Sequence, residues 1–277
     1  MLTNELVNKL KSVVGEENVI TNDVDLVCYA KDLTPYFCKP DIVVFPKSTE
    51  EVSKIVKIAA EEKIPITPRG AGMSFTGSSL PRKGGILIDL SKMNRIIGIF
   101  PEDFQCTVEP GVTFRDLNDK LSIYGLFFPI DVGSRDSCTI GGMISSNSHG
   151  HHGLKYGSVK HWVLGLKVVL ASGEIVSVGS KAQRSNCGYD LIGLFCGANG
   201  TLGIITEITL KVIPKPKYIV SIISFFDDTE DACKAVLDVL SSGVDASAIE
   251  IVDKFVLFPP DIKTCFPYFI KRLVQQY

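Results

Sequence analysis

The sequence feature that most constrains the fold is the glycine-rich stretch PRGAGMSFTG at residues 68–77. Apolar segments at 64–67 and 85–90 predict that it connects two strands. Three glycines within eight residues let the backbone adopt positive φ and approach a ligand closely. Consecutive backbone N–H groups in such a loop form an anion-binding concavity, to which Arg69, Ser74 and Thr76 add a charge and two hydroxyl groups. The stretch therefore predicts either a diphosphate cradle or a wide glycine turn.

This stretch differs from the two common phosphate-binding motifs. No Gly-Lys-Ser/Thr closes it, so it is not a P-loop, and its spacing G-x-G-x-x-x-x-G departs from the dinucleotide fingerprint G-x-G-x-x-G. A strand rather than a helix is expected to follow it, so a helix dipole is not the main attraction for an anion. The sequence therefore disfavours a Rossmann or P-loop nucleotide site.

A second long stretch, residues 129–157, shows little periodicity, and loops of that length are usually functional. It contains DVGS at 131–134, CTIGGMISSN at 138–147 and KYG at 155–157. Small residues and neutral hydrogen-bonding groups suit a flat heterocycle, and the alternative is a long solvated loop. Three histidines, His149, His151 and His152, lie in the same stretch. A surface cluster is favoured over a metal site, because adjacent histidines point apart and no carboxylate stands at ligand spacing; a catalytic histidine is the third interpretation.

Hydrophobic periodicity predicts alternating helices and strands as far as Pro214 and Pro216, which mark a boundary. The expected helices are 2–14, one that begins after Ser48, 112–124 and 189–196. The expected strands are 42–45, 64–67 (ended by Pro68), 85–90, 95–100, 104–109, 162–170, 174–178 and 203–213. Beyond the boundary, strands at 218–226 and 249–252 are expected around a helix at 230–240.

Composition and charge set the class of protein. The 277 residues are 45% hydrophobic and 22% charged, the balance of a folded soluble protein. The net charge of −2, with lysines and arginines scattered, argues against nucleic acid as a partner. The start of the chain lacks an apolar leader, so a cytoplasmic protein is expected, peripheral to a membrane at most through partners. The eight cysteines include no CxxC and fit neither zinc nor an iron–sulfur cluster, so reduced thiols and no metal are expected.

Four segments in order, 68–77, 138–147, 155–157 and 189–216, resemble FAD-linked oxidases whose flavin domain is of the vanillyl-alcohol-oxidase (PCMH) type. The resemblance is strongest to the group of D-lactate dehydrogenases and glycolate oxidase FAD subunits, and an ordered set is more specific than one motif. It implies an α+β fold: a PCMH-type FAD-binding domain over 1–216 with two α+β subdomains, about 40–110 and 111–216. The start of a ferredoxin-like substrate cap would occupy 217–277.

The resemblance also implies which residues hold non-covalent FAD. In the first loop these are Arg69, Gly70, Ala71, Gly72, Met73, Ser74 and Gly77. In the second they are Asp131, Gly133, Ser134, Thr139, Gly141, Gly142, Ser145, Asn147, Gly150 and Tyr156, and Gly203 and Ile204 follow. The family usually carries Glu at Asn199 and often Asn at Met143. Dissociable FAD is expected because the first loop has no histidine for covalent attachment and Cys138 resembles a packing residue.

The activity that the resemblance implies is oxidation of a small D-2-hydroxy acid, of the D-lactate or glycolate class, with hydride transfer to the flavin. The catalytic residues stay unassigned, because the His-Gly-Asp-Gly-Asn type motif of the family's cap is absent. The expectation is a fragment or a chain completed by a partner subunit, with an electron-acceptor protein as a further partner. Two alternatives stay open: an alkyl-glycerone-phosphate-synthase-like flavoenzyme, and a non-catalytic FAD-binding or electron-transfer subunit of a complex.

Overall fold

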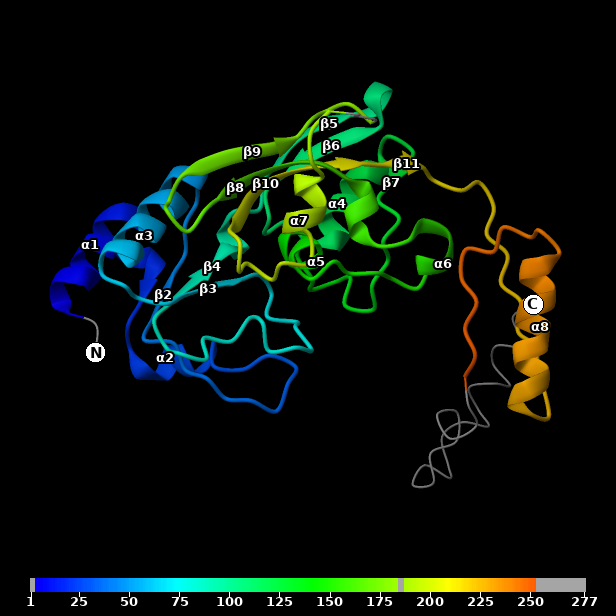
Figure 1. Ribbon diagram of the computed structural model, residues 1–277, viewed down its shortest axis with the longest axis horizontal. Coiled ribbons are helices and arrows are strands. Elements are labelled where there is room, and N and C mark those ends of the chain that lie inside the picture. The colour runs from blue at the N-terminus through cyan, green and yellow to red at the C-terminus, as the bar shows by residue number, and fades with distance from the viewer. Residues whose placement is uncertain (1–2, 184–186, 253–277) are drawn as a thin grey trace. The chain divides into compact units, whose positions relative to one another are not determined.

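The computed structural model describes residues 3–183 and 187–252, and the chain divides into two compact units after Pro216. The first unit contains two larger sheets with helices against them and, in its described residues, a further sheet of two short strands (Figure 1). The second unit contains, within its described residues, the helix α8 (Thr229–Ser241), whose N-cap is Asp228. No helix in the described part of the chain has the length and apolar character needed to cross a membrane.

The first sheet has the strand order β1-β2-β4-β3. Its strands are β1 (Val19–Ile20), β2 (Ile42–Val44), β3 (Ile66–Arg69) and β4 (Ile86–Asp89). The strands β2, β4 and β3 run parallel, and β1 is antiparallel to β2. The helices α1 (Asn4–Val14) and α3 (Thr49–Glu61) bury their apolar faces against it, while α2 (Asp23–Val27) contributes Leu26 to a smaller cluster with Val43 and Leu87.

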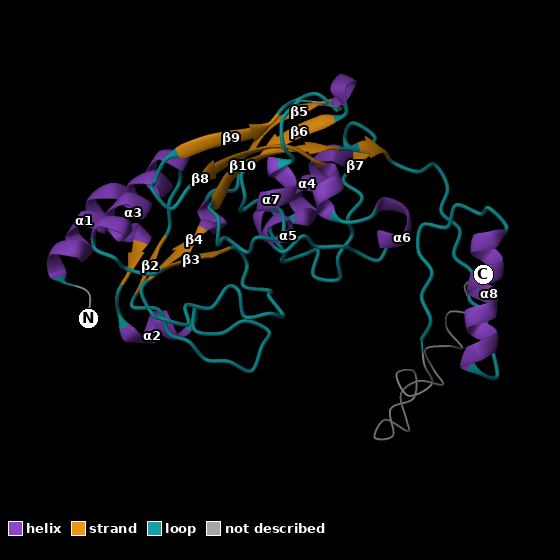
Figure 2. Ribbon diagram, in the orientation of Figure 1, coloured by secondary structure: helices purple, strands orange, loops and turns teal. Residues whose placement is uncertain are grey.

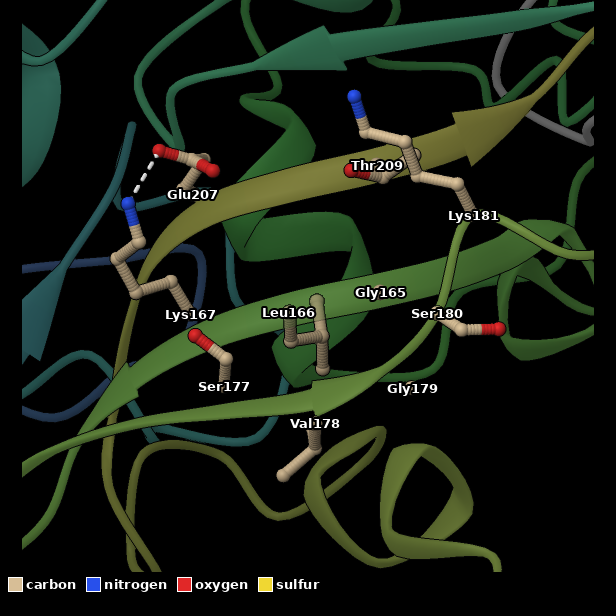
Figure 3. A pocket seen from close by; sticks show the side chains of 10 residues that line it. All are labelled: Gly165, Leu166, Lys167, Ser177, Val178, Gly179, Ser180, Lys181, Glu207 and Thr209. Carbon is tan, nitrogen blue, oxygen red and sulfur yellow. Dashed lines mark hydrogen bonds and ion pairs between the residues drawn. The ribbon is translucent and has the colours of Figure 1, made fainter. Parts of the chain in front are cut away.

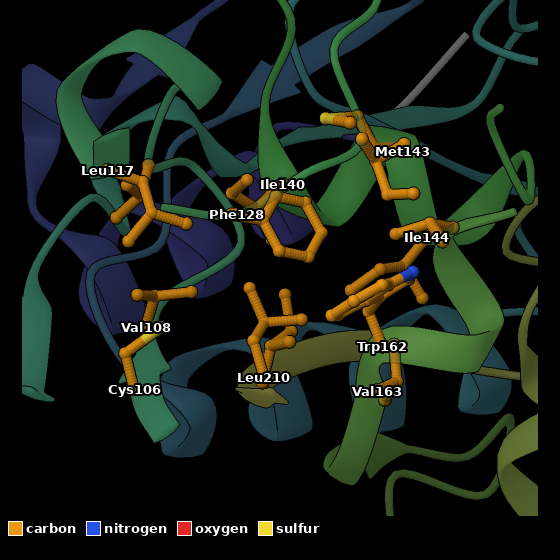
Figure 4. Packing of buried hydrophobic residues seen from close by; sticks show 14 of the residues in the cluster. Cys106, Val108, Leu117, Phe128, Ile140, Met143, Ile144, Trp162, Val163 and Leu210 are labelled. Atoms are coloured by element: carbon orange, nitrogen blue, oxygen red, sulfur yellow. The ribbon is translucent and has the colours of Figure 1, made fainter. Parts of the chain in front are cut away.

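The second sheet is antiparallel, with the order β5-β6-β10-β8-β9. Its strands are β5 (Ile96–Phe100), β6 (Gln105–Val108), β8 (Val163–Val169), β9 (Ile175–Gly179) and β10 (Ile204–Lys211). The helices beside it are α4 (Phe114–Ser122), α5 (Ile140–Ser145) and α7 (Leu191–Phe195). One core cluster joins sheet and helices, with Phe128, Ile140, Trp162 and Leu210 at its centre (Figure 4).

Smaller elements connect these layers. They are the short strand pair β7 (Leu126–Phe127) and β11 (Ile213–Pro214), the helix α6 (Gly153–Tyr156), and the 3₁₀ helices η1 (Glu16–Asn18), η2 (Leu90–Lys92), η3 (Pro101–Asp103) and η4 (Val159–Trp162). The two sheets share buried residues, since Val169 of β8 and Ile204 of β10 pack in the core of the first sheet. The hydroxyl of Ser53 also donates to Gly173 O at 2.5 Å, which ties α3 to the turn between β8 and β9.

Pro68 does not end its strand as expected, because β3 continues through Arg69 in parallel register with β4. This strand lies at the edge of its sheet, where a residue without an N–H group leaves no ladder bond unmade. The stretch 129–157 is likewise more regular than expected, since α5 and α6 lie within it. Both helices are too short for their hydrophobic period to be visible in the sequence.

The strands expected at 218–226 and 249–252 are wrong, because neither described segment forms a strand. The apolar side chains of the first segment are exposed; Tyr218, for example, is 89% exposed. A strand is stable only when its backbone pairs with a neighbour and one face is buried. The alternating pattern at 218–226 therefore favours a strand, but the described residues of this unit provide no neighbouring strand for it. The helix expected at 230–240 is confirmed as α8.

Candidate functional site

The first glycine loop, defined as Arg69–Ser79, starts at the carboxyl end of β3. Arg69 lies opposite Asp89, the last residue of β4, in parallel register, and both side chains are buried, at 9% and 5% exposure. Burial raises the pKa of Asp89 and lowers the pKa of Arg69, while their mutual attraction opposes both shifts. A buried pair of opposite charges therefore lies where the loop leaves the sheet.

The guanidinium of Arg69 lies on the buried side of the loop. Its Nη2 donates to Lys31 O at 3.0 Å, and its Cζ stands 5.9 Å from the centroid of the Tyr29 ring. Gly72 lies against it so closely that a Cβ there would overlap the guanidinium. Nη1 is buried, and among the described residues it has no hydrogen-bond partner. The site thus holds one unsatisfied buried cationic donor beneath its glycine backbone.

The tip of the loop is exposed and carries both hydroxyl groups and an apolar ring. Gly72 and Gly77 adopt φ of 69° and 74°, a conformation in which a side chain would be strained. The Ser74 hydroxyl lies 3.0 Å from those of Thr76 and Ser78, while Phe75 is 80% exposed. Ala71 is exposed and Met73 is half-buried. The loop thus presents hydroxyl groups beside the exposed ring of Phe75, while Gly72 and Gly77 are buried within it.

The second glycine loop, defined as Pro129–Gly157, meets the first at Gly70. A Cβ on Gly70 would overlap Thr139 Oγ1. Thr139 in turn caps α5 by accepting from Gly142 N at 3.3 Å, and a Cβ on Gly141 would stand 2.5 Å from Pro110 Cβ. These glycines permit the start of α5 to approach the end of β3, so the structure brings the two predicted loops into contact.

Residues 197–200 join both loops. The N–H of Asn199 donates to Ser145 O at 2.8 Å, and a Cβ on Gly200 would overlap the ring of Pro68. Asn199 has φ of 50°, a left-handed conformation that asparagine adopts more readily than glutamate. Asparagine is therefore well suited to this position.

Gly203 and Ile204 lie deeper in the same unit. A Cβ on Gly203 would stand 2.6 Å from Val168 Cγ1, and Ile204 is buried in the core of the first sheet. Their positions are set by packing between β10 and β8.

The remaining expected residues lie along the second loop, with Gly150 against Asp131. The carbonyl of Asp131 accepts from His151 N at 2.9 Å, and its backbone leaves no room for a Cβ on Gly150. Tyr156 stacks edge-on against Trp162, with ring centroids 5.9 Å apart. Gly133, Ser134 and Asn147 lie along the same loop: Gly133 stands beside His151, Ser134 O accepts from Cys138 N at 2.8 Å, and Asn147 Oδ1 accepts from Lys160 N at 3.4 Å.

Two polar atoms of the second loop, Asp131 Oδ1 and His152 Nδ1, are buried without a hydrogen-bond partner among the described residues. The other carboxylate oxygen of Asp131 lies 3.8 Å from Arg135. In the described part of the chain, no three histidine, cysteine or acidic side chains gather in a way that could hold a metal ion.

Sequence reasoning missed several residues of this site: Tyr29, Lys31, Asp89 and Gly200. Asp89 carried a usable signal, since it is the polar residue at the carboxyl end of an apolar strand, and the carboxyl ends of adjacent parallel strands share one edge of a sheet. Tyr29 and Lys31 carried none, because they reach Arg69 from a segment with no regular structure.

A shallow groove of about 130 Å³ lies elsewhere, on the face of the second sheet between β8, β9 and β10 (Figure 3). Lys167 Nζ and Glu207 Oε2 pair across it at 2.7 Å. None of the expected cofactor residues lines this groove, and the ion pair neutralises the two charges, so the glycine loops are the stronger candidate site.

The residues at the two loops fit a dinucleotide with a diphosphate group. The fit rests on the buried unpaired donor of Arg69, on glycines at which a Cβ would overlap neighbouring atoms, and on clustered hydroxyl groups. Cys138 is buried, and burial raises the pKa of its thiol, which leaves it a poor nucleophile for covalent attachment.

Fold and site together define a flavin-binding domain, and comparison with known proteins gives the family. The family model described as an FAD binding domain matches residues 40–179. The chain is 38% identical to glycolate oxidase subunit GlcD of Bacillus subtilis over 92% of this chain and 54% of that protein. It is 40% identical to the mitochondrial D-lactate dehydrogenase (cytochrome) of Arabidopsis thaliana over 90% of this chain and 44% of that protein.

A solved structure of alkyldihydroxyacetonephosphate synthase superposes with a TM-score of 0.76 at 23% identity, over 88% of this chain and 46% of that one, and shows the shared fold. The chain therefore belongs to the FAD-linked oxidoreductase family of glycolate oxidase subunits and D-lactate dehydrogenases, and FAD is its cofactor. The resemblance and the α+β class are confirmed. The chain spans about half the length of the curated relatives it matches.

Proposed function

We propose that this chain holds FAD non-covalently on its two glycine loops and takes part in the oxidation of a D-2-hydroxy acid, of the D-lactate or glycolate class, to the 2-oxo acid. The observation that carries the proposal is the contact between Gly70 and Thr139 above the buried Arg69, with Asn199 bonded to Ser145 beside it. The names of the relatives support the substrate class.

In this proposal the chain's own residues bind and orient the cofactor. The glycine backbone of the first loop, with Ser74 and Thr76, would hold the diphosphate, and residues 139–147 with Tyr156 would line the path of the ring system. Bound FAD supplies a hydride acceptor. The packing of Tyr156 against Phe127 and Trp162 would exclude water from one side of that path.

A partner subunit is part of the proposal, because one relative is named as a subunit of glycolate oxidase. Two other functions are distinguishable by experiment. An FAD-binding subunit without turnover would bind FAD and leave 2-hydroxy acids untouched. An alkyl-glycerone-phosphate-synthase-like activity is favoured only by the shared fold.

The test is reduction of the bound flavin. The purified chain should retain FAD through gel filtration, and D-lactate or glycolate should bleach the flavin absorbance anaerobically, with L-lactate as the stereochemical control. A colourless protein that added FAD does not stabilise against heat contradicts the cofactor assignment. Retained FAD that no 2-hydroxy acid bleaches contradicts the proposed turnover and favours the non-catalytic subunit.

A further inference from the structure

A segment of irregular backbone, residues 29–36, lies against the first glycine loop; we name it the brace. Both run through the long loops beside β2 and β3 (Figure 2). The N–H of Leu33 donates to Ser74 O at 3.2 Å, and Asp32 Oδ2 accepts from Ser79 Oγ at 3.2 Å. With the bond from Arg69 to Lys31 O, the brace is tied to the start, the middle and the end of the loop.

Arg69 is the central member of this contact, because it touches the brace on one side and the loop on the other. Tyr29 and Lys31 contact its guanidinium from the brace. Gly72 contacts it from the loop, with the positive φ that shapes the concavity. The guanidinium fills the space that a side chain at residue 72 would need, so its position and the backbone of the loop depend on each other.

The charge of Arg69 is incompletely compensated. Asp89 and Asp32 attract it, yet burial still lowers its pKa, and Nη1 has no partner among the described residues. A buried cation that lacks full hydrogen bonding is costly, and charges interact far more strongly in the protein interior than in water. An anionic ligand at the loop would offset that cost.

We propose that Arg69 is a positioning residue that couples the brace to the diphosphate: it holds the loop in shape from its buried side, and its uncompensated charge is balanced when a diphosphate binds. This inference rests on the proposed binding of FAD at the first loop. It goes beyond that binding in assigning the brace, residues 29–36, to the cofactor site, so that cofactor loading should order the brace.

The first test compares ligands with and without a diphosphate on the FAD-free full chain. Arg69→Met should weaken the binding of FAD and ADP by roughly tenfold or more, the scale of one hydrogen bond to a charged group. Riboflavin, which lacks phosphate, should bind the variant as it binds the wild type. The melting temperature of the ligand-free variant should fall, because the substitution leaves the buried Asp89 carboxyl without its cationic neighbour; the comparison of FAD and ADP with riboflavin separates this loss of stability from a loss of diphosphate binding.

Arg82→Met is the matched control. Arg82 lies just after the loop and, like Arg69, contacts both the loop, at Gly77, and the brace, where its Cζ stands 5.3 Å from the Tyr36 centroid; unlike Arg69, it is exposed. Its removal should change FAD affinity by less than about threefold, and salt should abolish the difference by screening. The inference is overturned if Arg69→Met binds FAD within about twofold of the wild type, or if both variants lose the same affinity. Failure of the wild type to bind FAD would instead contradict the proposed function.

The second test does not use Arg69→Met, so it stays available if that variant does not fold. In the wild type, FAD should slow hydrogen exchange at the Leu33 amide, which donates to the loop. Arg69→Lys retains the charge but lacks the planar fork, so it should bind FAD with little added protection at Leu33. Equal protection at Leu33 in both proteins, or none in the FAD-bound wild type, overturns the proposed coupling.

Discussion

The two glycine loops are alike in composition and differ in what holds them. The second loop is anchored by apolar side chains: Ile140 and Ile144 are fully buried in the core of the second sheet, and Met143 nearly so. The first loop is held by polar contacts, with Arg69 buried on one side of it and the exposed hydroxyls of Ser74 and Thr76 in contact, while Phe75 is exposed.

This difference indicates that the two loops are stabilised in different ways. Burial of apolar area contributes stability whether or not a ligand is present, so the second loop is part of the folded scaffold. Hydroxyl pairs and an incompletely compensated cation contribute little by themselves and respond strongly to an anion. We therefore expect the first loop to depend on the cofactor more than the second does.

The largest expected effect is on stability, at the second loop. Ile140→Ala should lower the free energy of unfolding by about 2–5 kcal/mol, because it deletes buried methyl and methylene groups in a packed core. Phe75→Ala, at the exposed tip of the first loop, should change it by less than about 0.5 kcal/mol. Urea unfolding measures both values. Equal losses in the two variants would remove the distinction between an apolar and a polar loop.

A smaller effect is expected where the loops meet. Gly70→Ala should cost about 1–3 kcal/mol, since its Cβ would overlap Thr139 Oγ1. Thr139→Ala removes that oxygen together with the cap of α5. In a double-mutant cycle, the pair should therefore be less destabilising than the sum of the single variants. Additive losses would show that the two loops do not contact each other at this point.

The smallest expected effect is the pH dependence of stability that Asp89, the buried residue opposite Arg69, contributes. Burial raises the pKa of Asp89 above its ordinary value of 3.8, so the folded state binds this proton more tightly than the unfolded chain. The stability from this group is complete below about pH 4 and is lost as pH rises through the raised pKa. Asp89→Asn keeps an oxygen that can accept from Ser91 N and should remove this loss.

Urea unfolding at several pH values between about 4 and about 7 measures the effect. The stability of Asp89→Asn relative to the wild type should increase across this range. Asp103→Asn, at an exposed aspartate, serves as the control and should follow the wild type. A constant difference between Asp89→Asn and the wild type would exclude Asp89 as the source of the pH dependence.

Much of the fold was predictable because its elements carry local signals. Ser48 with two glutamates in the next turn predicts the start of α3, and the alternating residues at 104–109 predict β6. The prediction at Pro68 was wrong because the edge position of β3 is a property of the sheet and not of the residue. The strand expected at 218–226 was wrong because strand formation needs a paired neighbour.

By itself, the sequence determined the two glycine loops, their order along the chain and the resemblance that led to FAD. These are local patterns of glycine, hydroxyl and apolar residues, and they persist in any conformation. Only the tertiary structure decided that Gly70 meets Thr139, that Gly200 lies on Pro68 and that Arg69 is buried beneath Gly72. Such contacts join residues up to about 130 positions apart, and their geometry follows from how the two sheets pack rather than from any one segment.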